Sequence, residues 1–261
     1  MLEFFQIALR SILANKLRSS MTLLGVVIGV WAITSMQGVV EGFDRAIEKE
    51  LSALGSESFV VSKFPPVMVG GHDFMKYVRR KDLTYKDALY LEEKAVNLQA
   101  ATAVIGTGGQ TVKYKDKKTS PTVRVTGTMS GYLATQSAEL AEGRFLTDND
   151  VTHTRQVAVL GRDVVAELFP YEYPLDKRVL MNGQAFTVIG VLGQTPSIFG
   201  QSADNVAITP ITAYEKVFTT SKRQMSNTNL FLRAWDAEGV EEAIDEVIAL
   251  LRVRRKVPLA E

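Results

Sequence analysis

The sequence predicts an α+β protein in which one N-terminal transmembrane helix with an amphipathic stalk precedes a mixed α/β domain. Two observations carry this prediction. Residues 19–40 form a run of 22 residues without a charged side chain, bounded by Arg18 and Glu41. After residue 55, short apolar runs of strand length alternate with segments of helical periodicity. The length of 261 residues allows one or two folded units, and the net charge of +1 gives no general attraction to nucleic acid.

Residues 1–18 are expected to form an amphipathic helix in the membrane interface. Their apolar side chains recur at mostly three- to four-residue spacing among polar and basic residues. The alternative, that these are the first turns of a longer membrane helix, remains open. The basic residues Arg10, Lys16 and Arg18 predict a cytoplasmic N-terminus, because lysine and arginine are retained on that side of the membrane.

Residues 19–54 are predicted to form the transmembrane helix and its stalk. A helix of 22 residues is about 33 Å long, enough to cross a hydrocarbon core of about 30 Å. A buried core helix rarely has such a run, and a signal peptide has a shorter apolar region of about 7–15 residues. The run also lacks the polar face of an amphipathic surface helix. The sequence therefore predicts a single-pass protein of the plasma (inner) membrane, with its main domain extracytoplasmic.

Gly25 and Gly29 form a small-xxx-small pattern inside this run. Such a pattern lets another helix approach closely in lipid, so both glycines are candidate helix-packing residues. Beyond Val40, apolar residues continue at helical spacing among charged ones until Gly55, which predicts that the helix extends as an amphipathic stalk.

The first part of the domain has the signals of a mixed fold. Thr84 with Asp87 three residues later resembles a capping box, and Ala88, Leu91, Ala95 and Leu98 give the helix an apolar stripe. Strands are expected at residues 58–62, 103–106, 110–114 and 122–127, a loop over 63–81, and turns at 108–109 and 115–118.

A second pattern begins at Gly143. Asn182-Gly183 predicts a type I′ hairpin, because both residues accept the positive φ angles of that turn. Strands are expected at 156–160, 178–181, 185–192, 205–209 and 229–234, helices at 163–168 and 240–251, and a loop over 193–204.

Several segments together are specific to one family. The membrane entry reads NKLRS at 15–19 and LLGVVIGV at 23–30; the domain contains GRFLTDND at 143–150, QVAVLG at 156–161, LFP at 168–170, PL at 174–175 and VLMNGQAFTVIGVL at 179–192. In this order and spacing they resemble the first transmembrane helix and the periplasmic core domain of MacB-type ABC transporter permeases. The resemblance implies that residues 55–261 are a MacB-like periplasmic core domain. It also implies a porter-like part from 55–129 plus 204–254, with a small β-rich subdomain, 130–203, inserted in it.

The motif residues are expected to be structural. Gly143 and Gly161 suit turns, Pro170 ends a helix, and Phe186, Val188 and Ile189 suit a sheet core. The motif positions singled out are Gly143, Arg144, Phe145, Gly161, Pro170, Asn182, Gly183 and Gly190.

The resemblance implies a permease-type subunit, or its N-terminal part, that passes the ATP-driven motion of a partner to an extracytoplasmic domain for export or efflux. The sequence has no G-x-x-x-x-G-K-[ST] phosphate loop, so a separate ABC ATPase subunit is expected. The family's C-terminal FtsX-like membrane helices are also expected to be missing, which calls for a second permease chain or the missing membrane half. The alternative is a single-pass membrane-anchored binding or adaptor protein without transport activity.

Enzymatic readings find little support in the sequence. The histidines, His72 and His153, fall in expected loops and belong to no metal-ligand pattern, and no G-x-S-x-G elbow occurs. Asp148 and Asp150 near His153 fit an acidic loop better than a catalytic site. With no cysteine, disulfides, iron–sulfur clusters and thiolate zinc sites are excluded. We therefore expect a non-enzyme without catalytic residues, metal or cofactor.

Overall fold

The computed structural model describes residues 16–53, 57–65, 74–136, 138–194, 202, 204–219 and 228–256. The chain divides into two compact units, Met1–Ser52 and Ala53–Glu261, and each is described by itself. For 43–53 and 74–76 only the backbone is described. Most of the expected interfacial helix over 1–18 lies outside the described residues, as does His72.

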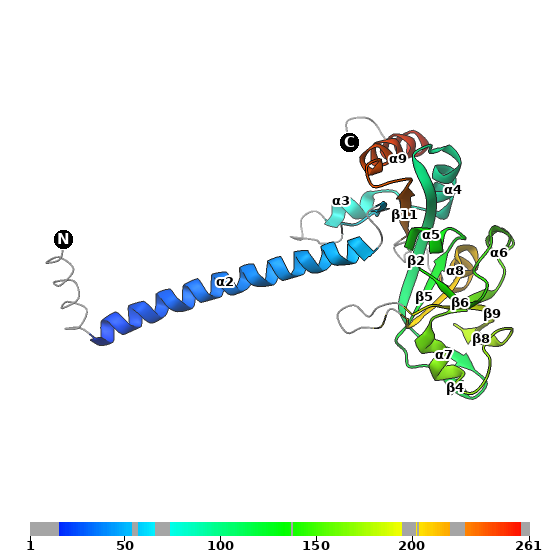
Figure 1. Cartoon of the computed structure of the whole chain (residues 1–261), viewed down its shortest axis with the longest axis horizontal. Coiled ribbons are helices and arrows are strands. Elements are labelled where there is room, and N and C mark those ends of the chain that lie inside the picture. The colour runs from blue at the N-terminus through cyan, green and yellow to red at the C-terminus, as the bar shows by residue number, and fades with distance from the viewer. Residues whose placement is uncertain are drawn as a thin grey trace. The chain divides into compact units, whose positions relative to one another are not determined.

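The first unit consists, in its described part, of one long helix. Helix α2 (Lys16–Ala53) runs for 38 residues without interruption (Figure 1). Its segment Lys16–Gly42 is long and apolar enough to cross a membrane, and none of that segment is buried in the structure. The prediction of one continuous helix through the apolar run and the charged extension is confirmed.

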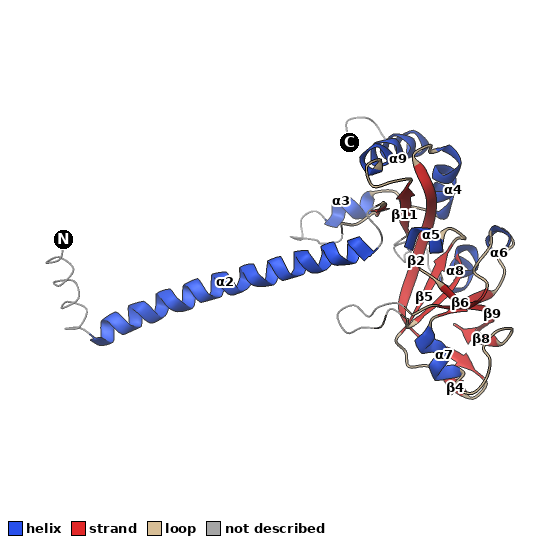
Figure 2. Ribbon diagram, viewed as in Figure 1, coloured by secondary structure: helices blue, strands red, loops and turns tan. Residues whose placement is uncertain are grey.

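The second unit is a mixed α/β domain (Figure 2). Its helices are α3 (Phe74–Arg79), α4 (Tyr85–Lys94), α5 (Tyr132–Gln136), α6 (Asp148–Thr152), α7 (Arg162–Leu168), α8 (Ile211–Phe218) and α9 (Val240–Arg255). Its strands are β1 (Ser58–Val61), β2 (Leu98–Gln110), β3 (Val112–Tyr114), β4 (Lys117–Lys118), β5 (Val123–Thr128), β6 (Leu140–Gly143), β7 (Val157–Leu160), β8 (Arg178–Met181), β9 (Gln184–Leu192), β10 (Val206–Pro210) and β11 (Asn229–Ala234).

The strands form one 11-stranded sheet in the order β1-β11-β2-β5-β10-β7-β9-β8-β3-β4, with β6 paired to β9. Two of the pairings, β5 with β10 and β7 with β9, are parallel. Strand β2 joins the two halves of this order, because Leu98 to Val104 pair with β11 while Ile105 to Gln110 pair with β5. The sheet is therefore continuous across the domain.

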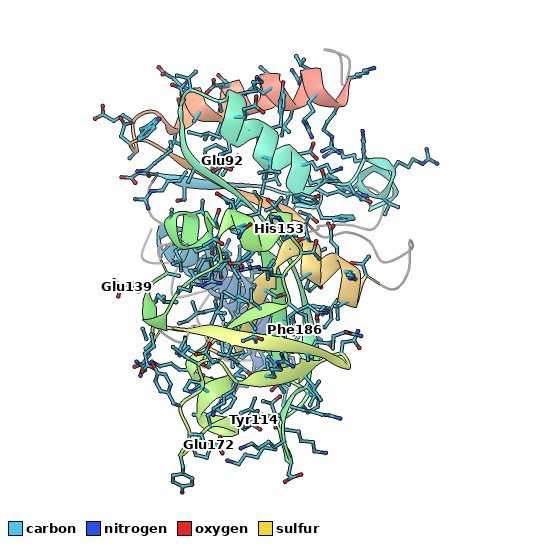
Figure 3. The ribbon with its side chains drawn as sticks, turned by 90° about the vertical axis from the view of Figure 1, so that its right-hand side faces the viewer. Glu92, Tyr114, Glu139, His153, Glu172 and Phe186 are labelled. Atoms are coloured by element: carbon cyan, nitrogen blue, oxygen red, sulfur yellow. The ribbon has the colours of Figure 1, made fainter. Side chains whose placement is uncertain are left out.

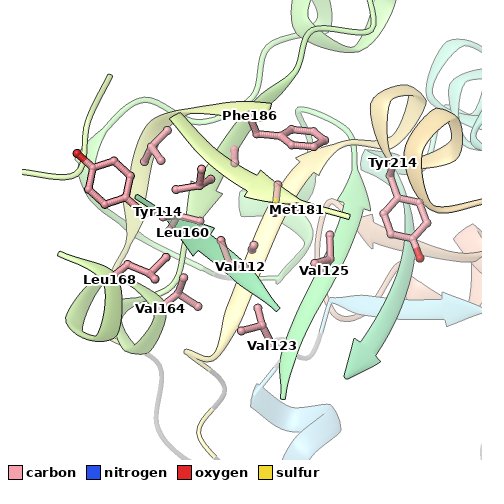
Figure 4. Close-up of a cluster of buried hydrophobic side chains, with 14 of the residues drawn as sticks. Val112, Tyr114, Val123, Val125, Leu160, Val164, Leu168, Met181, Phe186 and Tyr214 are labelled. Carbon is pink, nitrogen blue, oxygen red and sulfur yellow. The ribbon is translucent and has the colours of Figure 1, made fainter. Parts of the chain in front are cut away.

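Alternating side chains place the hydrophobic core on defined faces of the sheet. In β11 every second residue is buried, as the two-residue period of a strand requires. Helices α4 and α9 pack on each other and on β2 and β11, where Leu91, Leu232 and Val247 belong to one buried cluster. A second cluster lies between α7, α8 and the strands β3, β5, β7, β8, β9 and β10, and contains Val125 and Phe186 (Figure 4).

Local signals in the sequence identified several elements correctly. Helix α4 starts with the expected capping box, in which the backbone N–H and the hydroxyl of Thr84 both donate to the Asp87 carboxylate. The hairpin of β8 and β9 turns at Asn182 and Gly183, whose φ angles are 48° and 77°. The structure contains the strands expected at 58–62, 122–127, 156–160, 205–209 and 229–234 and the helices expected at 163–168 and 240–251, with each end within four residues of the prediction.

Other boundaries were wrong for identifiable reasons. The strand expected at 103–106 is the 13-residue β2, which begins at Leu98, so Leu98 belongs to a strand and not to the helix stripe. Gly108 and Gly109 do not end that strand; Gly109 has φ 71°, and the register with β5 shifts between Thr107 and Gln110, which is a bulge. The loop expected over 63–81 contains α3, whose six residues hold neither proline nor glycine.

The proposed division into 55–129 plus 204–254 and an inserted 130–203 stays a prediction. Strand β3, from the first of these ranges, pairs with β8 of the inserted range. Strand β10 pairs with β5 on one side and β7 on the other. Sheet pairing thus crosses the expected boundary twice.

Candidate functional site

The apolar part of α2 presents its side chains outward along the described segment. Leu17 is 82% exposed and Trp31 is 71% exposed, values that are unfavourable in water and ordinary in lipid. The hydroxyls of Ser20, Thr22 and Thr34 donate to backbone carbonyls three or four residues earlier in the same helix, at 2.9–3.2 Å. Their polar groups are thereby satisfied within the helix, as a bilayer interior demands.

The small residues of α2 leave open surface. Apart from the neighbouring residues and the adjoining helix backbone, no described atom lies within 4 Å of where a Cβ would stand on Gly25 or Gly29. Gly38 and Gly42 repeat the same four-residue spacing and are equally open. At 100° per residue, the Gly38 and Gly42 pair points away from the Gly25 and Gly29 pair. The helix thus offers two faces where another helix backbone can approach, although packing at Gly25 and Gly29 stays a prediction.

At Gly143, where the motif begins, the backbones of β6 and β9 come very close together. Gly143 has φ 78° and pairs with Gly190 of β9. A Cβ on Gly143 would collide with the carbonyl oxygen of Ile189 and stand 2.9 Å from the Cα of Gly190. A Cβ on Gly190 would in turn stand 2.5 Å from the carbonyl oxygen of Arg144. Both glycines are therefore required by the approach of β6 to β9.

Asp150 is the centre of an ion-pair cluster next to this approach of β6 and β9. Its side chain is fully buried and receives hydrogen bonds from the Arg144 guanidinium, the closest at 2.7 Å. Arg155 lies 3.5 Å from the same carboxylate. The backbone N–H and hydroxyl of Thr147 donate to Asp150 at 3.0 and 2.8 Å, which completes the capping box of α6. One acidic side chain thus ties the motif loop to the start of a helix.

The pKa of Asp150 reports how strongly it is held. Burial by itself raises the pKa of this carboxyl, but the hydrogen bonds from Arg144 and Thr147 outweigh burial and lower it to about 2. Asp150 is therefore ionised throughout the physiological range. Its carboxylate oxygens are occupied by hydrogen bonds and ion pairs from the domain itself. Asp150 is therefore a structural anion and not a general base.

The other motif residues also have structural positions. Phe145 is buried and stacks on Tyr132, with ring centroids 5.8 Å apart. Gly161 is the N-cap of α7 with φ −74°, in the connection between β7 and α7. Glycine is needed there because a Cβ would collide with the carbonyl oxygen of Asp204. Pro170 lies two residues beyond the end of α7, as expected.

The turn of the hairpin is tied to a distant helix. The side-chain amide of Asn182 donates to the carbonyl oxygen of Val217 in α8, at 2.8 Å. Gly183 has φ 77° and no atom within 4 Å of a Cβ position. Phe186 and Val188 are fully buried, as expected for the strand that follows, while Ile189 is half-buried against Phe145 and its neighbours.

The arginines at the end of α9 hold that helix to α4. Arg254 donates to Asp87 at 2.6 Å and stacks over the ring of Tyr90, 4.6 Å from the centroid. Arg255 donates to the backbone carbonyls of Lys81 and Asp82. Burial raises the pKa of Asp87, but the hydrogen bonds from Arg254 and Thr84 outweigh it, so the net pKa is lowered. The arginines at the end of α9 thus bind groups of the domain itself.

Replacing Arg254 by Met is expected to destabilise the domain by about 1–2 kcal/mol, because Asp87, whose side chain is 10% exposed, would lose its ionic partner. The control is Lys94→Met, which removes an exposed pair with Glu93 and should leave the stability nearly unchanged. Thermal unfolding of the full chain in detergent measures both. Equal losses in the two variants would contradict the assigned role.

The described residues contain no group of three or more His, Cys, Asp or Glu side chains able to hold a metal ion. His153 caps the end of α6, with Nδ1 3.1 Å from the carbonyl oxygen of Asn149. In Figure 3 it lies between Glu92 above and Phe186 below, apart from both. Asp148 accepts a hydrogen bond from the hydroxyl of Ser130. What the arrangement offers is a stiff scaffold around Asp150.

Comparison with known sequences identifies the relatives of this scaffold. The family described as the MacB-like periplasmic core domain matches residues 19–250. The macrolide export ATP-binding/permease protein MacB of Marinobacter nauticus is 31% identical over 214 residues, which are 80% of this chain and 31% of that protein. MacB of Bdellovibrio bacteriovorus is 28% identical over 261 residues, 100% of this chain and 39% of the relative. The chain thus spans less than half the length of these relatives.

Solved structures show the same fold. The periplasmic region of MacB from Actinobacillus actinomycetemcomitans superposes with a TM-score of 0.61 at 21% identity, covering 78% of this chain and 86% of that one. The extracellular domain of the noncanonic ABC-type transporter YknZ from Gram-positive bacteria gives 0.54 at 23% identity, covering 67% and 86%. The fold class and the resemblance inferred from the motifs are confirmed. The chain belongs to the family of the MacB-like periplasmic core domain, the domain of MacB-type ABC transporter permeases.

Proposed function

We propose that this chain acts as a permease-type subunit, or the N-terminal part of one, in an ABC transporter. It passes the ATP-driven motion of a partner ATPase to its extracytoplasmic domain, for export or efflux. The observation that carries the proposal is the uninterrupted helix α2 of 38 residues, joined in sequence to a domain of the MacB-like family. At 1.5 Å per residue this helix is about 57 Å long, well beyond a hydrocarbon core of about 30 Å.

A continuous helix suits the transmission of motion. Residues 16–53 contain no proline, so every backbone N–H beyond the first turn has a partner within the helix. Displacement at one end of such a helix is carried to the other without a hinge. This supports a mechanical role for α2 in addition to anchoring.

The cellular arrangement follows from the same proposal. The chain lies in the inner membrane with a cytoplasmic N-terminus and an extracytoplasmic domain, as the basic residues Lys16 and Arg18 favour. A separate ABC ATPase subunit supplies ATP hydrolysis. A second permease chain, or the membrane half that the relatives carry, packs on the open face at Gly25 and Gly29.

Chemical cross-linking in native membranes tests the partners. The expected result is a covalent complex with an ABC ATPase and with a second permease chain, and Gly25→Leu with Gly29→Leu should weaken the second of these. If neither partner is recovered, the proposal fails and an anchored binding or adaptor protein becomes the better description.

Breaking α2 beyond its apolar segment is expected to abolish coupling without loss of membrane insertion. Glu50→Pro removes a backbone hydrogen bond and kinks the helix, at a cost of about 3 kcal/mol or more. Because the chain has no cysteine, an Ala237→Cys label reports the distance between two domains in the assembled transporter by electron-spin resonance. ATP should shift that distance in the wild type and in the matched control Glu50→Ala, and not in Glu50→Pro. An equal shift in all three would refute mechanical coupling through α2.

A further inference from the structure

One face of the sheet near its β4 end carries an unusual row of side chains. Lys118 of β4 is paired directly with Lys113 of β3, and Lys113 is paired with Leu180 of β8. Residues opposite each other in neighbouring strands point to the same face, with Cβ atoms about 4.5–5.5 Å apart. Arg178, two residues before Leu180, points to that face as well. We call Lys113, Lys118, Arg178 and Leu180 the basic face.

The opposite side of the same strands is filled by the core. Val112, Val179 and Met181 are fully buried there, packed with Phe186 (Figure 4). The alternation therefore sorts apolar residues inward and the basic face outward. All four members of the basic face are exposed, and Leu180 keeps 44% of its surface open between the cations.

The charges of the basic face are not neutralised within the described part of the domain. Neither Lys113, Lys118 nor Arg178 forms an ion pair or a side-chain hydrogen bond with another described residue. The neighbouring Lys115 differs, because it pairs with Glu172 at 2.9 Å, as does the hydroxyl of Tyr114 (Figure 3). Like charges placed directly opposite each other in a sheet are destabilising. The facing Lys113 and Lys118 thus repel each other and lower the stability of the sheet locally. A bound anionic group would relieve this repulsion.

Protection of the sheet edge explains only part of this pattern. Lysine on a short edge strand discourages pairing with other chains, and Lys118 on the two-residue β4 fits that purpose. Lys113 and Arg178 lie on β3 and β8, which have neighbours on both sides in the sheet. Their charges add nothing to edge protection and need another explanation.

We propose that the basic face is a docking surface for a partner protein that presents carboxylates around an apolar side chain. The three cations would meet Asp or Glu side chains, and the apolar group would cover Leu180. Across the strands from β4 to β8 the row is about 10 Å wide, a width suited to one short protein segment. This inference does not rest on the proposed transport function, because it concerns only the folded domain.

Binding of a defined acidic peptide tests the proposal. The probe is a fluorescent peptide with two glutamates on each side of one leucine, titrated with the full chain in detergent and followed by anisotropy. Saturable binding that weakens as salt is raised is expected. The double variant Lys113→Glu with Lys118→Glu should reduce the affinity by about tenfold or more. Leu180→Ser should also weaken binding of this peptide, but not of the same peptide with serine in place of leucine.

The matched control reverses two exposed lysines on α4, Lys86→Glu with Lys94→Glu, which changes the net charge by the same amount. Affinity in this control should stay within about twofold of the wild type. The proposal is overturned if no peptide binding is seen, or if the α4 control loses as much affinity as the β3 and β4 variant. It is equally overturned if vesicles of phosphatidylglycerol compete fully with the peptide for the basic face. None of these outcomes bears on the cross-linking and distance tests of transport.

Discussion

Gly143→Ala is expected to cost about 2–5 kcal/mol of folding free energy. The positive φ of 78° disfavours an L side chain by about 1–2 kcal/mol. The collision with the Ile189 carbonyl adds about 1–3 kcal/mol, because both contacts are backbone and neither strand can retreat without breaking its pairing. For a domain of this size the melting temperature should fall by about 4–20 °C.

Gly183→Ala is the matched control for this experiment. Gly183 has nearly the same backbone angle, φ 77°, but no atom lies within 4 Å of a Cβ position. The conformational cost is therefore shared, and only the collision differs. We expect about 1–2 kcal/mol for Gly183→Ala, measured by thermal unfolding of the full chain in detergent. Equal shifts for the two variants would show that β6 and β9 do not approach as closely as the structure has them.

The features that were predictable from sequence are those set by neighbours along the chain. Asn182-Gly183 defines its hairpin through the φ angles of two residues, and Thr84 with Asp87 defines a helix start within one turn. The uncharged run from 19 to 40 defines a membrane-length helix by composition alone. Family motifs supplied the fold of the domain, and the comparisons confirm it.

The features that were missed depend on contacts between distant segments. Gly161 resembled a turn glycine, yet it is required by the carbonyl of Asp204, 43 positions later in the sequence. Gly109 looked like a chain reversal and is a bulge, because β2 continues to Gln110 to pair with β5. Helix α8 was overlooked although Ile211, Tyr214 and Phe218 give it an apolar stripe directly after Pro210. Arg144 was read as a motif residue, but its pairing with Asp150 was not foreseen.

The pairing of Arg144 with Asp150 makes the domain sensitive to acid. The folded-state pKa of Asp150 is about 2, below its ordinary value of 3.8. A carboxyl with a lowered pKa stabilises the folded state above its unfolded pKa and loses that contribution as the pH falls through the folded pKa. The difference is worth about 2 kcal/mol, lost between about pH 4 and pH 2. Asp150→Asn should therefore flatten this part of the stability profile.

Arg144→Gln is expected to cost about 3 kcal/mol at neutral pH, because it leaves a fully buried carboxylate with weaker compensation. The matched control is Arg155→Gln: Arg155 is 55% exposed and lies 3.5 Å from the same carboxylate, so less than about 1 kcal/mol is expected. Thermal unfolding at pH 7 and at pH 3 shows whether the lost stability comes from the charge of Asp150 or from packing of the loop. If Arg144 acts through the charge of Asp150, the difference between Arg144→Gln and wild type must shrink as Asp150 is protonated. A difference that stays constant with pH would mean that Arg144 stabilises the loop through packing and its bond to the Phe145 carbonyl.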